Sequence, residues 1–72
     1  MYEILQELAT KKGITIAELE RKAGLSNGSV SKYKKGVPTI TAFIKLADAL
    51  EISATTLLRR YMNEQENTHT HS

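Results

Sequence analysis

Hydroxyl residues and glycines divide this chain into short segments, and this spacing constrains the fold more than any other feature. A Ser or Thr side chain can accept a hydrogen bond from a free N–H group at a helix start, and such residues stand at Thr15, Ser26, Thr39 and Ser53. Glycine favours the left-handed turn that ends many helices, and it stands at Gly13, Gly24 and Gly36. The pattern predicts five helices, over residues 2–12, 16–23, 27–35, 40–50 and 54–62.

Apolar residues recur every three or four positions within these segments, as expected for one buried face of a helix. The segment 40–50 shows this spacing most clearly, and no strand-like alternation of useful length competes with it. With 72 residues, the chain is near the lower limit for a domain that folds on a single core. We therefore expect an all-α, compact five-helix domain over residues 1–62 and a disordered polar tail over residues 63–72.

Composition excludes several kinds of site. The chain has no cysteine, so disulfides and thiolate zinc sites are ruled out. Its two histidines, His69 and His71, both lie in the polar tail, so the folded body has none to activate a serine nucleophile. We expect no metal, no cofactor and no enzymatic activity. No apolar run approaches the roughly 20 residues of a membrane span, and we expect a cytoplasmic protein.

Positive charge is concentrated in one part of the chain. The formal net charge is only +2, yet residues 21–35 contain five basic residues and no acid. Such a stretch indicates an anionic partner, although a solvated basic face without a partner has the same composition. The five residues are Arg21, Lys22, Lys32, Lys34 and Lys35.

A helix over residues 27–35 would turn Val30 and Tyr33 toward the core and leave a small, polar outer face. Gly28 would cost that helix about 1 kcal/mol relative to Ala, so stability does not explain this face. A DNA major groove accepts such a helix, because Asn can pair with adenine and Lys with guanine or phosphate. The short helix 16–23 and the link "GLS" precede it, which is the helix-turn-helix arrangement.

Most of the chain, residues 4–58, resembles the Xre/Cro repressor-like helix-turn-helix family, the lambda-repressor-like DNA-binding domains. The matching stretches are "GITIAELERKAGLSNGSVSKYKKG" and "PTITAFIKLADALEISATTLL". The resemblance implies a sequence-specific transcriptional regulator, expected to be a repressor, that reads the major groove of double-stranded DNA with residues 27–35. It also implies a homodimer on a near-palindromic operator.

The resemblance further assigns individual contacts. The family's base-contacting positions fall on Asn27, Gly28, Ser29 and Lys32, with Ser31 nearby. Its backbone-contacting positions fall on Thr15, Ile16, Ser26, Lys35, Val37 and Thr39. Many members have Gln where this chain has Ile16, so the phosphate bond from that side chain is absent here.

Two charged residues depart from the family pattern. Glu20 stands where the family prefers Ala, and Lys34 occupies a position that often pairs with the residue at position 9, here Ala9. We hypothesise that Lys34 pairs with Glu20 across the neighbouring helices. The alternative is that both side chains extend into water.

Four apolar residues near the end of the fifth segment exceed what so small a core can bury. We expect at least one or two of them to form a dimer patch, unless this helix only closes the core; the candidates are Leu57, Leu58, Tyr61 and Met62. The same face could bind a toxin or another regulator, so an antitoxin-type or other protein-interaction module is the alternative function. A helical scaffold without a nucleic-acid partner would leave the basic stretch unexplained.

Overall fold

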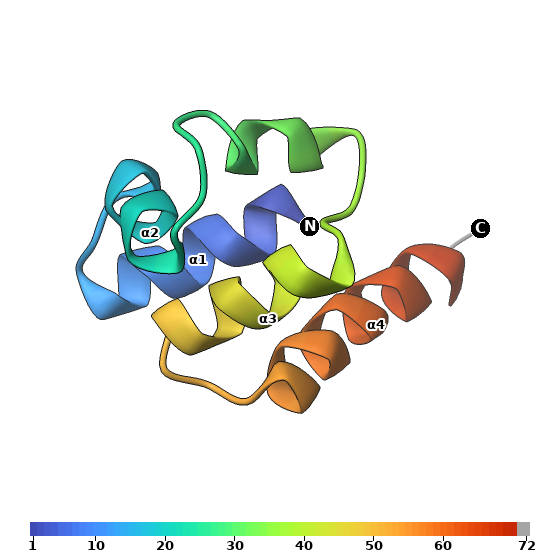
Figure 1. Cartoon of the computed structure of the whole chain (residues 1–72). Helices are drawn as coiled ribbons and strands as arrows, with labels where there is room; N and C mark the ends of the chain where they lie inside the picture. The colour runs from blue at the N-terminus through green and yellow to red at the C-terminus, as the bar shows by residue number, and fades with distance from the viewer. Residues whose placement is uncertain (71–72) are drawn as a thin grey trace.

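The computed structural model describes the backbone of residues 1–70 and the side chains of residues 1–63. Within residues 1–70 there is no strand, so the all-α class is confirmed. The expected count of five α-helices is wrong, because the third helical segment is a short 3-10 helix (Figure 1). The elements in chain order are α1 (Tyr2–Lys12), α2 (Ile16–Ala23), η1 (Val30–Lys34), α3 (Ile40–Ala49) and α4 (Ala54–Thr70).

Three of the four predicted hydroxyl caps are confirmed. The Thr15 hydroxyl accepts the N–H of Glu18 at 3.1 Å, and the Glu18 carboxylate accepts the N–H of Thr15 at 3.2 Å. The Thr39 hydroxyl accepts the N–H of Ala42 at 3.2 Å, and the Ser53 hydroxyl accepts the N–H of Thr56 at 3.0 Å. Side-chain oxygens thus satisfy free N–H groups at the starts of α2, α3 and α4.

The glycine pattern is confirmed for the first two helices only. Gly13 and Gly24 adopt the left-handed conformation, with φ of 76° and 72°, directly after α1 and α2. Gly36 does not adopt it, and Gly28 does, with φ of 88°. The predicted left-handed end of the third helix is therefore wrong, and the left-handed residue precedes that helix instead.

The core is a single apolar cluster to which every helical element contributes. Leu5, Leu19, Val30, Leu46 and Leu57, one residue from each element, are fully buried. In this arrangement α1 lies against both α2 and η1, and α3 lies against both α2 and α4 (Figure 1). The buried Val30 and the half-buried Tyr33 anchor η1 to the core, and Ser31, Lys32 and Lys34 remain exposed.

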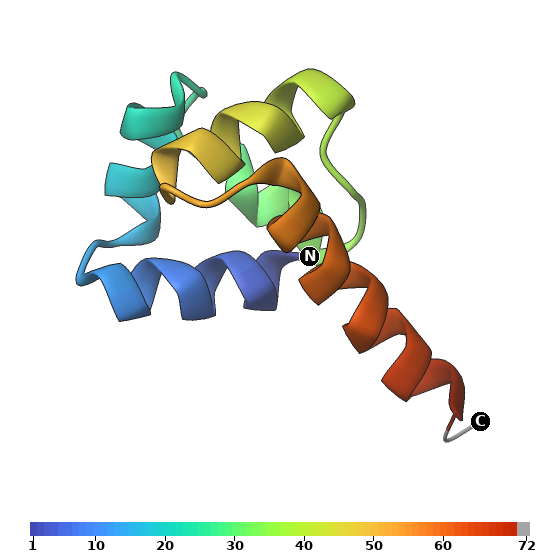
Figure 2. The same cartoon turned by 90° about the horizontal axis from the view of Figure 1, so that it is seen from below.

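The last helix is longer than expected. It continues to Thr70 rather than ending near residue 62, and its last turns project past the body of the molecule (Figures 1 and 2). Residues 63–70 contain neither Gly nor Pro, and a helix already formed adds a hydrogen bond for each further residue. The division into a domain over 1–62 and a tail over 63–72 stays a prediction, and residues 71–72 lie outside the described part.

Candidate nucleic-acid interface

The segment between α2 and η1 is a turn rather than the start of a helix. After Gly24 ends α2, the N–H of Leu25 donates to the carbonyl of Glu20 at 2.8 Å, and the N–H of Ser29 donates to the carbonyl of Ser26 at 3.1 Å. Gly28 lies inside this turn with its left-handed φ. The predicted helix over 27–35 is therefore wrong in its first three residues, and it begins only at Val30.

A carboxylate from α2 caps this turn in place of the predicted Ser26. One Glu20 oxygen, Oε1, accepts the N–H of Gly28 at 3.1 Å, and the other, Oε2, accepts the N–H of Val30 at 2.9 Å. Only 3% of Glu20 is exposed. We did not predict this cap from the sequence, although an acid at a position where the family prefers Ala was a signal for it.

The hypothesised pair between Lys34 and Glu20 is wrong. Both Glu20 oxygens accept backbone N–H groups, and the Lys34 ammonium lies 4.8 Å from the centre of the Tyr2 ring. A cation over an aromatic face is attracted by the electrons of the ring. Lys34 therefore connects η1 to the first turn of α1 rather than to α2.

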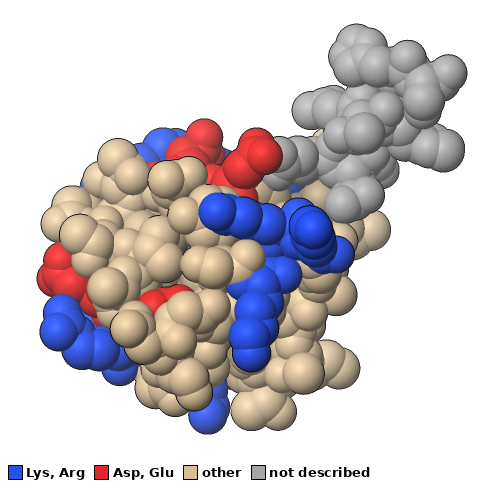
Figure 3. Space-filling view, turned by 90° about the horizontal axis from the view of Figure 1, so that it is seen from above, with Lys and Arg blue, Asp and Glu red and all other residues tan. Residues whose placement is uncertain are grey.

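The residues predicted to contact bases lie together on the turn and on η1. Four of them, Asn27, Gly28, Ser31 and Lys32, are exposed, and Ser29 is half-buried. Figure 3 looks at the molecule from the side of the turn and η1, and Lys and Arg side chains gather on one part of this face beside a broad neutral surface. A largely uncharged area next to cations suits the edge of a DNA groove, where phosphates flank the bases.

The residues predicted to contact the DNA backbone vary in availability. Ser26, Lys35, Val37 and Thr39 are exposed around the turn, η1 and the following loop, and so is Thr15 at the start of α2. The hydroxyls of Thr15 and Thr39 are already engaged as helix caps. Ile16 is half-buried and packs against the core, so its backbone N–H is the polar group it offers there.

Tyr33 lies on η1 between exposed lysines and is itself half-buried. Burial raises the pKa of its phenol, and the nearby negative charge of Glu20 raises it further. The phenol therefore stays protonated at neutral pH and adds no negative charge beside the basic residues.

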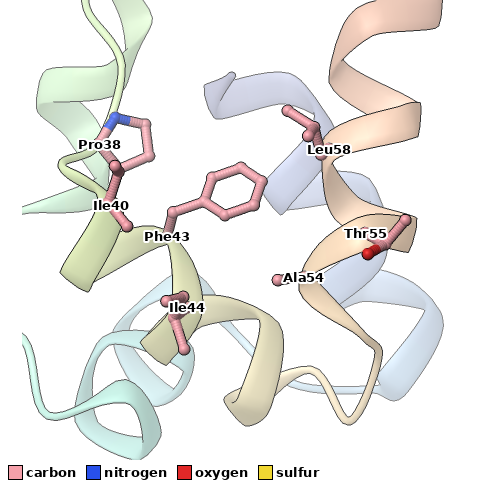
Figure 4. Close-up of a pocket in the computed structure, with 7 residues that line it drawn as sticks. All are labelled: Pro38, Ile40, Phe43, Ile44, Ala54, Thr55 and Leu58. Atoms are coloured by element: carbon pink, nitrogen blue, oxygen red, sulfur yellow. The ribbon is translucent and has the colours of Figure 1, made fainter.

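A second surface feature is an apolar groove between α3 and α4, with a volume of about 370 Å³. Phe43 projects between the two helices, with Ile44 beside it on α3 and Leu58 across from it on α4 (Figure 4). Three apolar residues that line it are largely exposed to solvent: Ile40 is 80% exposed, Ile44 47% and Leu58 45%. Pro38, Ala54 and Thr55 complete its lining.

The residues exposed near this groove differ from those predicted for the dimer patch. Leu57 is fully buried in the core, so it is excluded as a member of a surface patch, whereas the patch itself stays a prediction. Tyr61 is half-buried and packs against the core. Leu58 and Met62 are exposed, and the exposed apolar surface extends from them toward α3 rather than along α4 alone.

The arrangement of α2, the turn and η1 on an all-helical body defines a helix-turn-helix protein. A family model described as helix-turn-helix matches residues 5–57, and the chain belongs to this family of Xre/lambda-repressor-like DNA-binding regulators. No curated protein and no solved structure matches the chain significantly.

The described residues contain no group of three acidic, histidine or cysteine side chains arranged to hold a metal ion. None of the helices in the described part combines the length and the apolar character needed to span a bilayer.

Proposed function

We propose that this protein is a sequence-specific transcriptional regulator, acting as a repressor, that reads the DNA major groove with residues 27–32. The observation that carries this proposal is the exposed surface of the turn and η1, on which Asn27, Ser31 and Lys32 are all exposed. Asn and Lys offer the hydrogen-bonding groups that distinguish adenine and guanine in that groove. Gly28, which has no side chain, and the half-buried Ser29 add little bulk where this surface would enter the groove.

Phosphate contacts on both sides of this segment would set the orientation of the protein on DNA. Lys35 supplies a cation, and Ser26 supplies a hydroxyl that no helix cap occupies. At Ile16 the first N–H groups of α2 lack partners within the helix, which favours a phosphate there. Val37 and Thr39, exposed in the loop that follows η1, are the remaining backbone contacts that we propose.

A homodimer is the form in which we propose that the protein binds. The stretch 21–35 offers five exposed basic residues, which gives a single copy limited affinity, and a second copy on the same DNA adds to it. Exposed apolar clusters often mark interfaces, and the groove with Ile40, Ile44 and Leu58 is such a cluster. Two copies would contact half-sites about one helical turn apart, near 34 Å. The proposed location is the cytoplasm, at the nucleoid.

Selection from random DNA duplexes with the purified protein tests the DNA-binding proposal. We expect enrichment of a palindromic motif with half-sites about 10 base pairs apart. Enrichment of no motif at all would contradict the proposal of sequence-specific binding, and a single non-repeated motif would contradict the homodimer.

The groove also favours a second candidate function, binding of a partner protein such as a toxin. Sedimentation of Ile44→Asp distinguishes the two uses of this surface. We expect the substitution to weaken self-association, because a charge in an apolar interface is costly. Thr41→Asp places the same charge on the same helix outside the groove lining and is the control. A wild-type protein that stays monomeric at all concentrations and still needs Ile44 to bind another protein would support the partner instead.

A further inference from the structure

Glu20 is the one buried charged side chain among residues 1–63, and it faces the segment that we propose reads DNA. We propose that Glu20 is a positioning residue for DNA recognition: its carboxylate holds the backbone of the turn in the conformation that presents Asn27 and Ser29 to base edges. This inference rests on the proposed function and adds a residue that does not touch DNA itself.

The chemistry of the site supports this role. A buried carboxylate is costly unless it is well satisfied, and no cation pairs with Glu20 among the described side chains. Its two oxygens instead accept two backbone N–H groups at 3.1 and 2.9 Å. Hydrogen bonds to an ionised acceptor are stronger than those between neutral groups. An Ala at this position would leave both N–H groups without their acceptor.

The two bonds fall at the places where the turn needs support. One holds Gly28, whose left-handed φ of 88° reverses the chain, and the other holds Val30, the first residue of η1. Without them, the turn would keep two backbone hydrogen bonds, from Leu25 to the Glu20 carbonyl and from Ser29 to the Ser26 carbonyl, and neither holds Gly28 or Val30. The exposed Asn27 lies between α2 and these two anchor points, so its position depends on them.

If Glu20 positions the turn, its removal should weaken DNA binding, whereas electrostatics alone predicts tighter binding. DNA is a polyanion, so a neutral residue at position 20 should bind it slightly more tightly. That repulsion is screened over a Debye length of about 8 Å in physiological salt. Loss of a charge-assisted hydrogen bond that shapes the turn is the larger effect. The sign of the change in affinity therefore separates the two explanations.

Glu20→Gln is the informative substitution, because it keeps the size of the side chain and replaces one acceptor oxygen with an NH₂ group. One of the two backbone N–H groups then faces a donor instead of an acceptor. Glu18→Gln is the matched control: it removes the same charge from the same helix, and Gln serves as well as Glu in the cap on Thr15. Circular dichroism establishes that both variants are folded.

Binding is measured by fluorescence anisotropy with the duplex selected by the wild-type protein and with a scrambled duplex, over a range of salt concentrations. We expect Glu20→Gln to bind the selected duplex about tenfold more weakly and the scrambled duplex as the wild type does. The salt dependence should not change, because no phosphate contact is lost. Glu18→Gln should bind both duplexes as tightly as the wild type or slightly more tightly, because it removes a negative charge and leaves the turn intact.

The proposal is overturned if Glu20→Gln binds the selected duplex as tightly as Glu18→Gln, or loses the same factor on both duplexes. If the wild-type protein prefers no duplex, the proposed function fails and this inference fails with it. Hydrogen exchange of the free wild-type protein gives a test that does not depend on the variant folding. The amides of Gly28 and Val30 should be protected, and exchange as fast as that of exposed amides would also overturn the proposal.

Discussion

Replacement of Gly28 by Ala tests the turn directly, because the turn and the helix that the sequence predicts give opposite signs. In a helix, Ala would be more stable than Gly by about 1 kcal/mol. In the structure Gly28 has a φ of 88°, and a Cβ there would meet no atom within 4 Å. The cost of Gly28→Ala is therefore one of backbone conformation and not of crowding.

The magnitude follows from two terms. A left-handed backbone costs an L-residue roughly 1–2 kcal/mol. Ala also lowers the conformational entropy of the unfolded chain, which stabilises the folded protein by about 0.4–1 kcal/mol. We expect a net destabilisation of about 1 kcal/mol, or a fall in Tm of about 4–8 °C for a domain of this size. Gly28→Asn should lose less, because Asn tolerates this conformation better than Ala.

Gly36→Ala is the matched control. Gly36 lies outside the left-handed region, and a Cβ there would be in ordinary contact with the Lys32 carbonyl at 3.8 Å. We expect it to stabilise the protein by about 0.4–1 kcal/mol. Urea denaturation followed by circular dichroism measures both variants. A Gly28→Ala protein more stable than the wild type would refute the turn and restore the longer helix.

Three other substitutions test the DNA interface and a surface ion pair. Lys32→Ala should reduce discrimination at one or two base pairs by about 1–3 kcal/mol in competition binding; an equal loss on every sequence would contradict its role as a base contact. Lys35→Ala should weaken all duplexes alike and reduce the slope of log affinity against log salt by about one; an unchanged slope would argue against a phosphate contact. Lys12 lies 3.0 Å from Glu51, and its hydrogen bond and charge lower the pKa of that carboxyl. A lowered folded pKa stabilises the protein above the ordinary Glu pKa, and this is lost as the pH falls through the lowered value. The difference in unfolding free energy between wild type and Lys12→Ala should thus shrink in acid, and a constant difference would show that the pair is not its source.

Local patterns were enough to predict the helical scaffold. The bounds of α1 and α2 agree with the prediction, and α3 ends at Ala49, one residue earlier than expected. These helices carry their start signals at Thr15 and Thr39 and, for α1 and α2, their stop signals at Gly13 and Gly24. Each signal acts over three or four residues, so the sequence alone reveals it.

The site was harder to predict because its decisive bonds are not local. Ser26 has the sequence context of a helix cap, yet the acceptor for the turn comes from Glu20, up to ten residues away from the N–H it binds. Local spacing likewise assigned Leu57 to a surface patch, whereas the packing of α4 on the core buries it. The contacts of individual residues with DNA stay predictions, since they depend on a partner that the sequence does not contain.

The contact between Tyr2 and Lys34 has a practical consequence for handling the protein. Met1 packs against the core, and the carbonyl of Met1 accepts the N–H of Leu5, so the first residues of α1 support η1 directly. An affinity tag or fluorophore fused ahead of Met1 would crowd the element that we propose enters the groove. The last turns of α4 project sideways beyond the body of the molecule (Figure 2), and a label attached there would crowd η1 less than one fused ahead of Met1.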